Sequence, residues 1–261
     1  MQTLIRFGRW IFSFAIVALG AENIVCARVS IAALGPGTHT LPVLPWLPPV
    51  PWLAIFFGAL WIACGAGLLI HHWQRASAYT LAVTYTLWML VQVLPKYVAS
   101  PGDMGLRTVV FEPLALAAMA LLMPGPSATP KWLSLACRAV ITIAMIVFGV
   151  DHFLALAGIG TLVPGWIPWH VFWIALFGAA FIAAGIGVWL DRLGQWSWIG
   201  LGLMFGIWVI TLHIPRTLGF YHIPGAITDP DEWSSLFIAM GLWGGPWALA
   251  ANLKSAQQTA L

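Results

Sequence analysis

The chain has 261 residues, of which 61% are hydrophobic and only 7% are charged. Soluble domains carry about 25% charged residues, so the sequence excludes a water-soluble globular protein and predicts an integral membrane protein. The net charge of +3 comes from singly spaced basic residues, which excludes the clustered basic surface of a nucleic-acid-binding protein. The three cysteines, Cys26, Cys64 and Cys137, lie too far apart to suggest a zinc site or a disulfide framework.

A membrane-spanning helix needs about 20 mainly apolar residues. Eight segments fit, which predicts an all-α protein with eight transmembrane helices, at 8–27, 51–70, 76–95, 108–123, 133–156, 169–190, 196–214 and 233–252. The first segment, preceded by Arg6 and Arg9, also resembles a signal peptide. Its pattern recurs at 138–153, inside the chain, where no signal peptide can lie. The first helix is therefore expected to be retained.

The chain repeats itself at a regular spacing. Three residues at the end of the seventh segment, Trp208, Pro215 and Arg216, correspond to residues 120 positions upstream, Trp88, Pro95 and Lys96. The same spacing relates Gly58, Gly65 and Gly67 to Gly178, Gly185 and Gly187. These matches predict two four-helix bundle repeats, residues 1–125 and 126–261. Because each repeat has an even number of crossings, the two are expected to lie parallel in the membrane.

Basic residues are distributed unevenly between the two sides of the predicted bundle. The side that holds both termini receives Arg6, Arg9, Arg75, Lys131, Arg138, Arg192 and Lys254, with Asp191 as its only acid. The opposite side receives the other acids, Glu22, Asp103, Glu112, Asp151, Asp229, Asp231 and Glu232. Because Lys and Arg are in excess on cytoplasmic loops, both termini are expected in the cytoplasm and the protein in the inner (cytoplasmic) membrane.

Polar residues of the second repeat converge at the predicted outer side. Asp151 and His152 end the fifth segment, Trp166 lies in a Pro-rich loop, and His213 and Arg216 end the seventh segment. Ionisable groups in a membrane are costly and indicate a functional site by default, so these five are the candidate ligand-binding residues. Two other interpretations stay open, a structural polar clasp between helices and a metal site. No metal is expected, because no ligand spacing such as HxxxH is present.

The first repeat carries weaker counterparts of these residues. Glu22, Asn23 and Lys96 stand where the second repeat has Asp151, His152 and Arg216, and Val93 replaces His213. The polar site of the second repeat is therefore expected to matter more for function than that of the first repeat.

Two local patterns near the site predict where helices end and begin. Pro215 lacks an N–H, so it is expected to end or kink the helix and to leave the Thr211 carbonyl without its usual donor. The stretch 229–232 reads as an N-cap, a proline at the first helical position and a glutamate at the third.

These motifs resemble the DoxX-like family of small bacterial and archaeal membrane proteins. The resemblance is carried by Phe148-Gly149-x-Asp151-His152-Phe153, Val163-Pro164-x-Trp166-Ile167-Pro168, Gly185-x-Gly187 and His213-x-Pro215-Arg216. A usual member is one four-helix unit, so the resemblance implies a tandem double unit. The family takes its name from the membrane part of an archaeal thiosulfate:quinone oxidoreductase, and its relatives are linked with thiol or oxidative-stress systems.

The resemblance implies a redox-associated subunit, quinone- or thiol-linked, that acts at the outer face. A quinone is then the expected cofactor, and the lipid bilayer and an outer-side redox protein are the expected partners. In this hypothesis His213 and Arg216 contact the quinone head group, Asp151 orients His152 or relays a proton, and Trp166 covers the ring.

Two alternatives from other classes remain: a small-solute or lipid carrier or channel, and a structural scaffold without a ligand. A carrier should show paired polar residues at mid-membrane, whereas 59–63 and 179–183 are apolar. No complete catalytic set is visible, so the sequence decides neither an enzymatic activity nor an oligomeric state.

Overall fold

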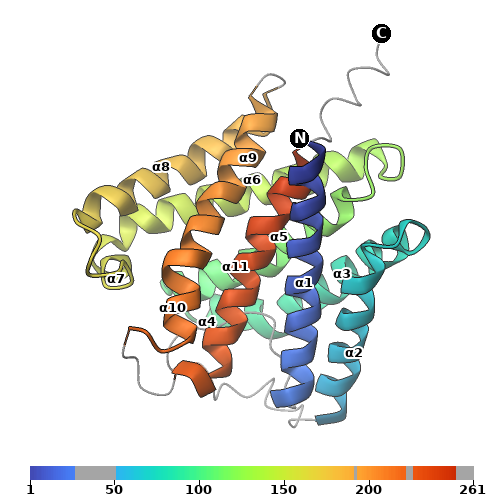
Figure 1. The fold of residues 1–261 in the computed structure, drawn as a ribbon, viewed down its shortest axis with the longest axis horizontal. Coiled ribbons are helices and arrows are strands. Elements are labelled where there is room, and N and C mark those ends of the chain that lie inside the picture. The colour runs from blue at the N-terminus through green and yellow to red at the C-terminus, as the bar shows by residue number, and fades with distance from the viewer. Residues whose placement is uncertain (27–50, 191–192, 222–225, 251–261) are drawn as a thin grey trace.

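The computed structural model describes residues 1–26, 51–190, 193–221 and 226–250, and within them the chain is helical throughout (Figure 1). The long helices are α1 (Gln2–Cys26), α2 (Pro51–Gly67), α3 (His71–Trp88), α5 (Met104–Leu122), α6 (Lys131–Leu154), α8 (His170–Gly187), α9 (Gly194–Trp208) and α11 (Pro230–Leu249). Short elements connect or extend them: η1 (Met89–Val93), α4 (Leu94–Ala99), α7 (Leu156–Gly160), η2 (Val209–His213), α10 (Ile214–Thr217) and η3 (Ala226–Thr228).

Each of the eight predicted segments coincides with a helix, which confirms the all-helical class. Among the described residues, six helical stretches are long and apolar enough to cross a membrane. Three are α5, α6 and α8, and the other three are Gln2–Val25, His71–Ala99 and Gly194–Thr217. The shorter α2 is equally apolar, and α11 is 20 residues long but begins with two acids.

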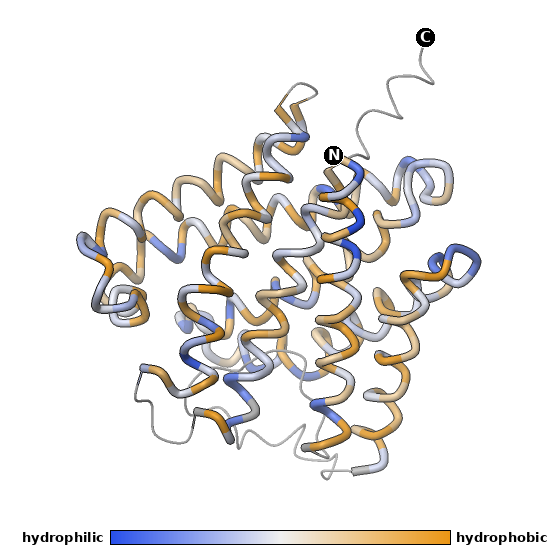
Figure 2. The backbone as a smooth tube through the Cα atoms, viewed as in Figure 1, coloured by the Kyte–Doolittle hydropathy of each residue, from blue (hydrophilic) through white to orange (hydrophobic). Residues whose placement is uncertain are grey.

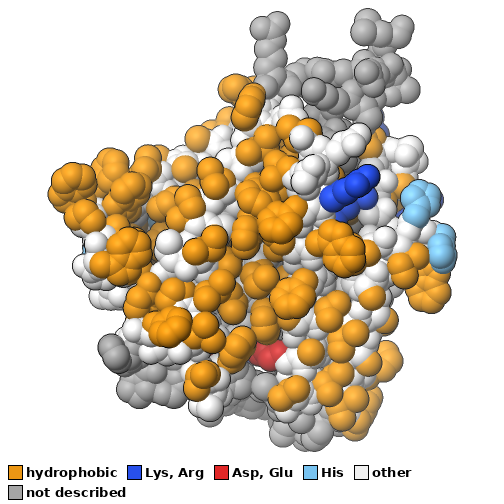
Figure 3. Space-filling view, in the orientation of Figure 1, with side chains coloured by type: hydrophobic (Ala, Val, Ile, Leu, Met, Phe, Trp, Pro, Cys, Tyr) orange, Lys and Arg blue, Asp and Glu red, His pale blue; other side chains and the backbone are white. Residues whose placement is uncertain are grey.

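Apolar side chains cover the outside of these helices as well as their contacts. Large side chains in the middle of the helices are half exposed, among them Phe14, Val83, Ile143 and Leu203, at 50–55%. Hydrophilic residues instead gather mainly at the helix ends, and the face drawn in space-filling form shows many hydrophobic and few charged side chains (Figures 2 and 3). Such a surface is suited to lipid, because hydrocarbon and not water must solvate it.

The long helices form a closed ring, and a contact between two of them across the ring divides it into two parts. Each packs against the next long helix along the chain, from α1 through to α11, and α11 packs against α1. Because α5 and α11 also touch, they form a shared central wall. We call the space enclosed by α1, α2, α3 and this wall the first bundle, and that enclosed by α6, α8, α9 and the wall the second bundle. Each bundle therefore contains a helix from the other half of the chain.

Paired glycines bring neighbouring helices into backbone contact. A Cβ on Gly20 of α1 would lie 2.5 Å from the Gly58 carbonyl oxygen of α2. In the second half, a Cβ on Gly149 of α6 would lie 2.6 Å from the Gly178 carbonyl oxygen of α8. Small residues let two helix backbones approach closely, and this packing matters in membranes because the hydrophobic effect does not hold one helix against another there.

Two helices contain a widened turn immediately before a proline. In η1 and η2 the backbone is π-helical, and the N–H groups of Leu94 and Ile214 bond the carbonyls five residues back. The cause is that Pro95 and Pro215 have no N–H for the usual bond to the fourth residue back. The helix therefore does not end at Pro215 but widens before it and continues to Thr217.

The glycine contact between α6 and α8 leads to a stability prediction. Gly149→Ala is expected to lower the free energy of unfolding by about 1–3 kcal/mol, because its methyl group would push apart two rigid backbones. Thermal unfolding of the purified chain in mild detergent measures this change.

Gly200→Ala is the matched control, since a Cβ there meets nothing within 4 Å. Alanine favours a helix over glycine by up to about 1 kcal/mol, so this variant should unfold at the same temperature or higher. A Gly149→Ala protein as stable as the parent would contradict the close crossing.

Candidate functional site

A cavity of about 440 Å³ lies in the second bundle, between α5, α6, α8, α9, η2 and α11. Small-molecule sites usually enclose about 300–1,000 Å³, so its size suits a ligand of modest dimensions. Aromatic rings form much of the wall, from Phe148, Phe181, Phe205 and Trp208. The polar side chains that line it are Thr108, Glu112, Asp151, His152, His213 and Ser235.

The structure brings three of the five predicted site residues to this cavity. Asp151, His152 and His213 all line it, although they come from α6 and η2. Trp166 does not, and its side chain is 69% exposed in the loop before α8. The indole ring at the cavity is that of Trp208. Arg216 is also absent from the lining, because its side chain turns to another partner.

Asp151 connects α6 to α5 and does not orient His152. Its carboxylate accepts a hydrogen bond from the Arg107 guanidinium, with which it forms an ion pair, and a second one from the Thr108 hydroxyl at 3.3 Å. Asp151 is 5% exposed, and a buried carboxylate needs such partners to remain charged. Since Arg107 and Thr108 belong to the first half of the chain, this pairing joins the two halves at the cavity.

His152 is held by its own helix. Its Nδ1 lies 2.7 Å from the Phe148 carbonyl oxygen, and since a carbonyl can only accept, Nδ1 carries the proton. In the neutral ring, Nε2 is then a hydrogen-bond acceptor. The Phe181 ring lies 5.2 Å from the imidazole, centroid to centroid. Gly178 of α8 makes room for this arrangement, because a Cβ there would lie 3.0 Å from that of His152.

Glu112 lines the cavity but was not recognised as a site residue in the sequence. It was placed among the outer-side acids, whereas the structure places it within α5, nine residues after the N-cap Asp103. At about 1.5 Å per residue, Glu112 lies on the order of 13 Å along the helix from that end. Within the described part of the chain, its carboxylate has no hydrogen-bond or ion-pair partner. The available signal was an acid inside the otherwise apolar run at 108–123.

Arg216 forms a structural clasp with α11. Its Nε and Nη2 bond both carboxylate oxygens of Glu232 at 2.6–2.8 Å, and the Thr217 hydroxyl donates to the Glu232 backbone oxygen at 3.2 Å. Glu232 stands at the start of α11, where Asp229 is the N-cap and Pro230 follows it, as the sequence suggests. The forked geometry of arginine suits such two-point pairing with a carboxylate.

A second contact secures the π-helical turn that carries His213. The Thr211 carbonyl, which loses its usual donor because of Pro215, accepts a hydrogen bond from the Tyr221 hydroxyl at 2.5 Å. The turn is therefore held at Thr211 by Tyr221 and just beyond its end by the Arg216–Glu232 clasp. The position of His213 at the cavity depends on both contacts. π-Helical turns occur frequently at functional sites.

The counterparts in the first half have different surroundings. Glu22 accepts a hydrogen bond from the Ser234 hydroxyl at 2.5 Å, which joins α1 to α11. Asn23 is fully buried, and Lys96 is half-buried with no ion-pair partner among the described residues. Glu22 and Asp151 thus both accept a hydrogen bond from a hydroxyl on the facing wall helix.

Across the described residues, no group of three or more His, Cys, Asp or Glu side chains is placed to hold a metal ion. No protein-family model matches the chain, and neither a curated protein nor a solved structure matches it.

The clasp leads to a prediction about Arg216. Arg216→Ala should lower the free energy of unfolding by about 2 kcal/mol, because it leaves the Glu232 carboxylate without its charged donor. Lys96→Ala, 120 positions upstream, is the matched control and should change stability by less than about 0.5 kcal/mol. Thermal unfolding in detergent compares the two. Equal losses of stability in the two variants would mean that the Arg216–Glu232 pair makes no specific contribution to stability.

Proposed function

We propose that the chain is a redox-associated membrane subunit whose second-bundle cavity binds a quinone-like molecule. The observation that carries this proposal is the convergence of Glu112, His152 and His213, three acid–base groups, on one cavity lined with aromatic rings. The resemblance of the surrounding motifs to the DoxX-like family favours a quinone over other ligands of this size.

The residues present fit a quinone head group. A quinone is planar and takes up two electrons and two protons at its two carbonyl oxygens when it is reduced to a quinol. Phe181, Phe205 and Trp208 offer flat apolar surfaces for the ring. Glu112, which has no partner among the described residues, offers a carboxyl group that a ligand can satisfy.

The acid–base side chains have distinct roles in this proposal. Glu112 on α5 and His213 on η2 hold or release the protons exchanged with the ligand oxygens, and His152 Nε2 accepts a hydrogen bond. The Arg107–Asp151 pair is neutral as a whole, so it fixes α5 against α6 without adding net charge. The two electrons come from an outer-side redox protein. Arg216 and Trp166 have no role in this proposal, since neither lines the cavity.

A second candidate, a proton-coupled carrier of small solutes, is favoured by the depth of Glu112. The sequence argued against a carrier because the mid-helix positions it considered were apolar. A carboxyl group without a protein partner inside a bundle is, however, typical of proton relays in transporters. Solute-driven proton movement in proteoliposomes, lost in Glu112→Gln, would favour this candidate.

We also infer eight crossings in two parallel repeats, 1–125 and 126–261, with both termini in the cytoplasm. The π-helical turns at 89–93 and 209–213 support this inference, because they lie 120 residues apart, the spacing of the sequence matches. Two aromatic contacts have the same spacing: Trp61 meets Tyr85 at 5.0 Å, and Phe181 meets Phe205 at 5.3 Å, both edge to face.

Labelling of single cysteines tests the proposed topology. In a chain that lacks its native cysteines, Ser127→Cys should react with a membrane-impermeant maleimide only after the cells are opened. Gly102→Cys should react in intact cells. Both positions are exposed, and a Cβ at Gly102 meets nothing within 4 Å. Labelling of Ser127→Cys in intact cells would overturn the orientation.

Titration with a short-tailed quinone tests the ligand. Trp208 lines the cavity, so binding should quench tryptophan fluorescence, and Trp208→Phe should remove much of this signal. Glu112→Gln and His213→Ala should each weaken binding at least about tenfold, because each removes a hydrogen bond that involves an ionisable group. Equilibrium dialysis measures affinity without relying on fluorescence.

His72→Ala is the matched control, since His72 is an exposed residue in the first turn of α3. It should bind the quinone as the parent does. Absence of binding, or equal affinity in the parent and in a chain with both Glu112→Gln and His213→Ala, would leave the cavity residues as a structural polar cluster.

A further inference from the structure

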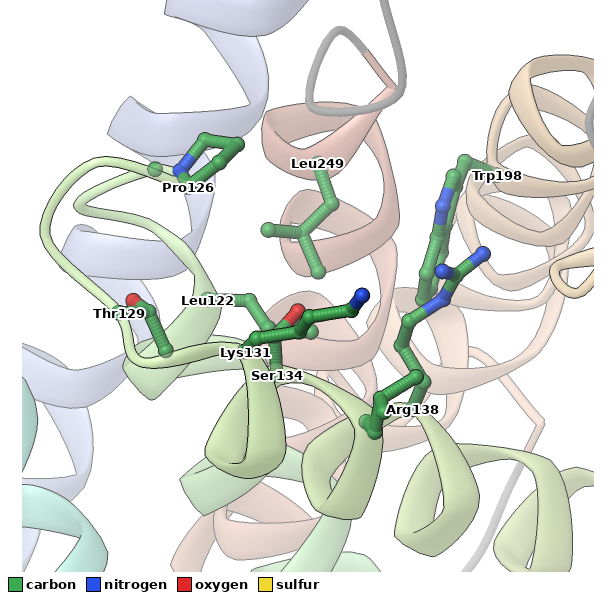
Figure 4. A pocket seen from close by; sticks show the side chains of 10 residues that line it. Leu122, Pro126, Thr129, Lys131, Ser134, Arg138, Trp198 and Leu249 are labelled. Carbon is green, nitrogen blue, oxygen red and sulfur yellow. The ribbon is translucent and has the colours of Figure 1, made fainter. Parts of the chain in front are cut away.

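A second cavity, of about 410 Å³, lies at the end of the molecule where α1 begins. It is enclosed by the α5–α6 connection, the first turns of α6 and the facing parts of α9 and α11 (Figure 4). Its lining combines two cations, Lys131 and Arg138, with two hydroxyl side chains, Thr129 and Ser134. The rest of the lining is mainly apolar: Leu122, Gly125, Pro126, Leu135, Trp198 and Leu249.

The two cations reach the same space. Figure 4 shows the Lys131 and Arg138 side chains extending from α6 into the region between Leu249 and Trp198. Arg138 is fixed there, because its Nη2 donates to the Val188 carbonyl and its guanidinium lies 5.2 Å from the centre of the Trp189 ring. Lys131 is exposed, so its ammonium group can adjust to a ligand.

The charge around this cavity is strongly positive. Arg9 donates to the Met123 carbonyl at 3.2 Å, which places the start of α1 beside the α5–α6 connection. Arg6 lies one turn before it. None of the seven acids within the described residues lines this cavity, and the eighth, Asp191, lies outside those residues. An anionic ligand therefore meets several cations here.

We propose that this cavity binds the head group of an anionic phospholipid. The phosphate lies between Lys131 and Arg138, within reach of the Ser134 hydroxyl, and the acyl chains follow the apolar residues toward the hydrocarbon. A lipid fits better than a soluble anion because most of the lining is apolar. The neighbouring Trp132 is 70% exposed, as is typical of the tryptophans at a membrane–water interface. Basic pockets between membrane helices bind lipid head groups in this way.

The bound lipid would connect the two halves of the chain. Leu122 belongs to α5, in the first half of the chain, whereas Trp198 and Leu249 belong to α9 and α11, in the second half. A head group held among them bridges the central wall to the second bundle at the end opposite the clasp of Arg216 and Glu232. It should therefore stabilise the packing of the wall in addition to occupying the cavity.

Native mass spectrometry and thermal unfolding of the detergent-purified full chain test this site. Dioleoyl phosphatidylglycerol should form a retained adduct and raise the unfolding temperature, whereas dioleoyl phosphatidylcholine at the same concentration should do neither. Lys131→Gln should weaken the adduct about fivefold, the effect of one basic residue near an anionic lipid surface. Lys131→Arg should restore it.

Arg75→Gln is the charge-matched control, because Arg75 is exposed on α3 and does not line the cavity. It should bind phosphatidylglycerol as the parent does. Equal loss in Lys131→Gln and Arg75→Gln would overturn the site in favour of general charge attraction. Equal binding of phosphatidylcholine, or equal stabilisation by inorganic phosphate at the lipid concentration, would also overturn it, the latter by indicating a soluble-anion site.

Discussion

In a bilayer every backbone N–H and C=O must find its partner inside the protein, since hydrocarbon offers none. This chain must meet that constraint although its helices contain prolines, each of which lacks a backbone N–H donor. Before Pro95 and Pro215 the helix widens into a π-helical turn, and the Tyr221 hydroxyl bonds the Thr211 carbonyl that Pro215 leaves without its usual donor. The shape of the second-bundle cavity follows from this local solution, because the widened turn is the segment that carries His213.

The same constraint explains why Glu112 is unusual. Three other acids of the described helices are paired across helix contacts: Asp151 with Arg107, Glu232 with Arg216, and Glu22 with Ser234. Each of these pairs joins helices that the ring brings together, and their role is fully explained by packing. Glu112 has no such partner within the described chain, although it lies deep along α5. A ligand or a proton is therefore the natural counterpart of this carboxyl group.

The helices could be predicted because each depends on a local property, a run of about 20 apolar residues. Asp151, His152 and His213 could be selected as candidates for the same reason, since an ionisable residue beside an apolar run is visible in the sequence, and the structure places all three at one cavity. The role of Arg216 could not, because its partner Glu232 lies on another helix and the pairing depends on how α10 meets α11. Glu112 was missed because the distribution of charges along the sequence placed it with the acids of the outer face. Its place at the second-bundle cavity depends on α5 packing against α6, a contact between the two halves that no local pattern encodes.

The closure of the ring by α1 and α11 has a consequence for biogenesis. Glu22 and Ser234 are separated by 212 positions, so at about 5–20 residues per second the ribosome makes the second partner on the order of ten to forty seconds after the first. Throughout that interval α1 is in the insertion machinery or the bilayer with a carboxyl group that lacks its final hydrogen bond. Assembly of the first bundle therefore waits for completion of the second, and a ribosome that stalls before α11 leaves both bundles open.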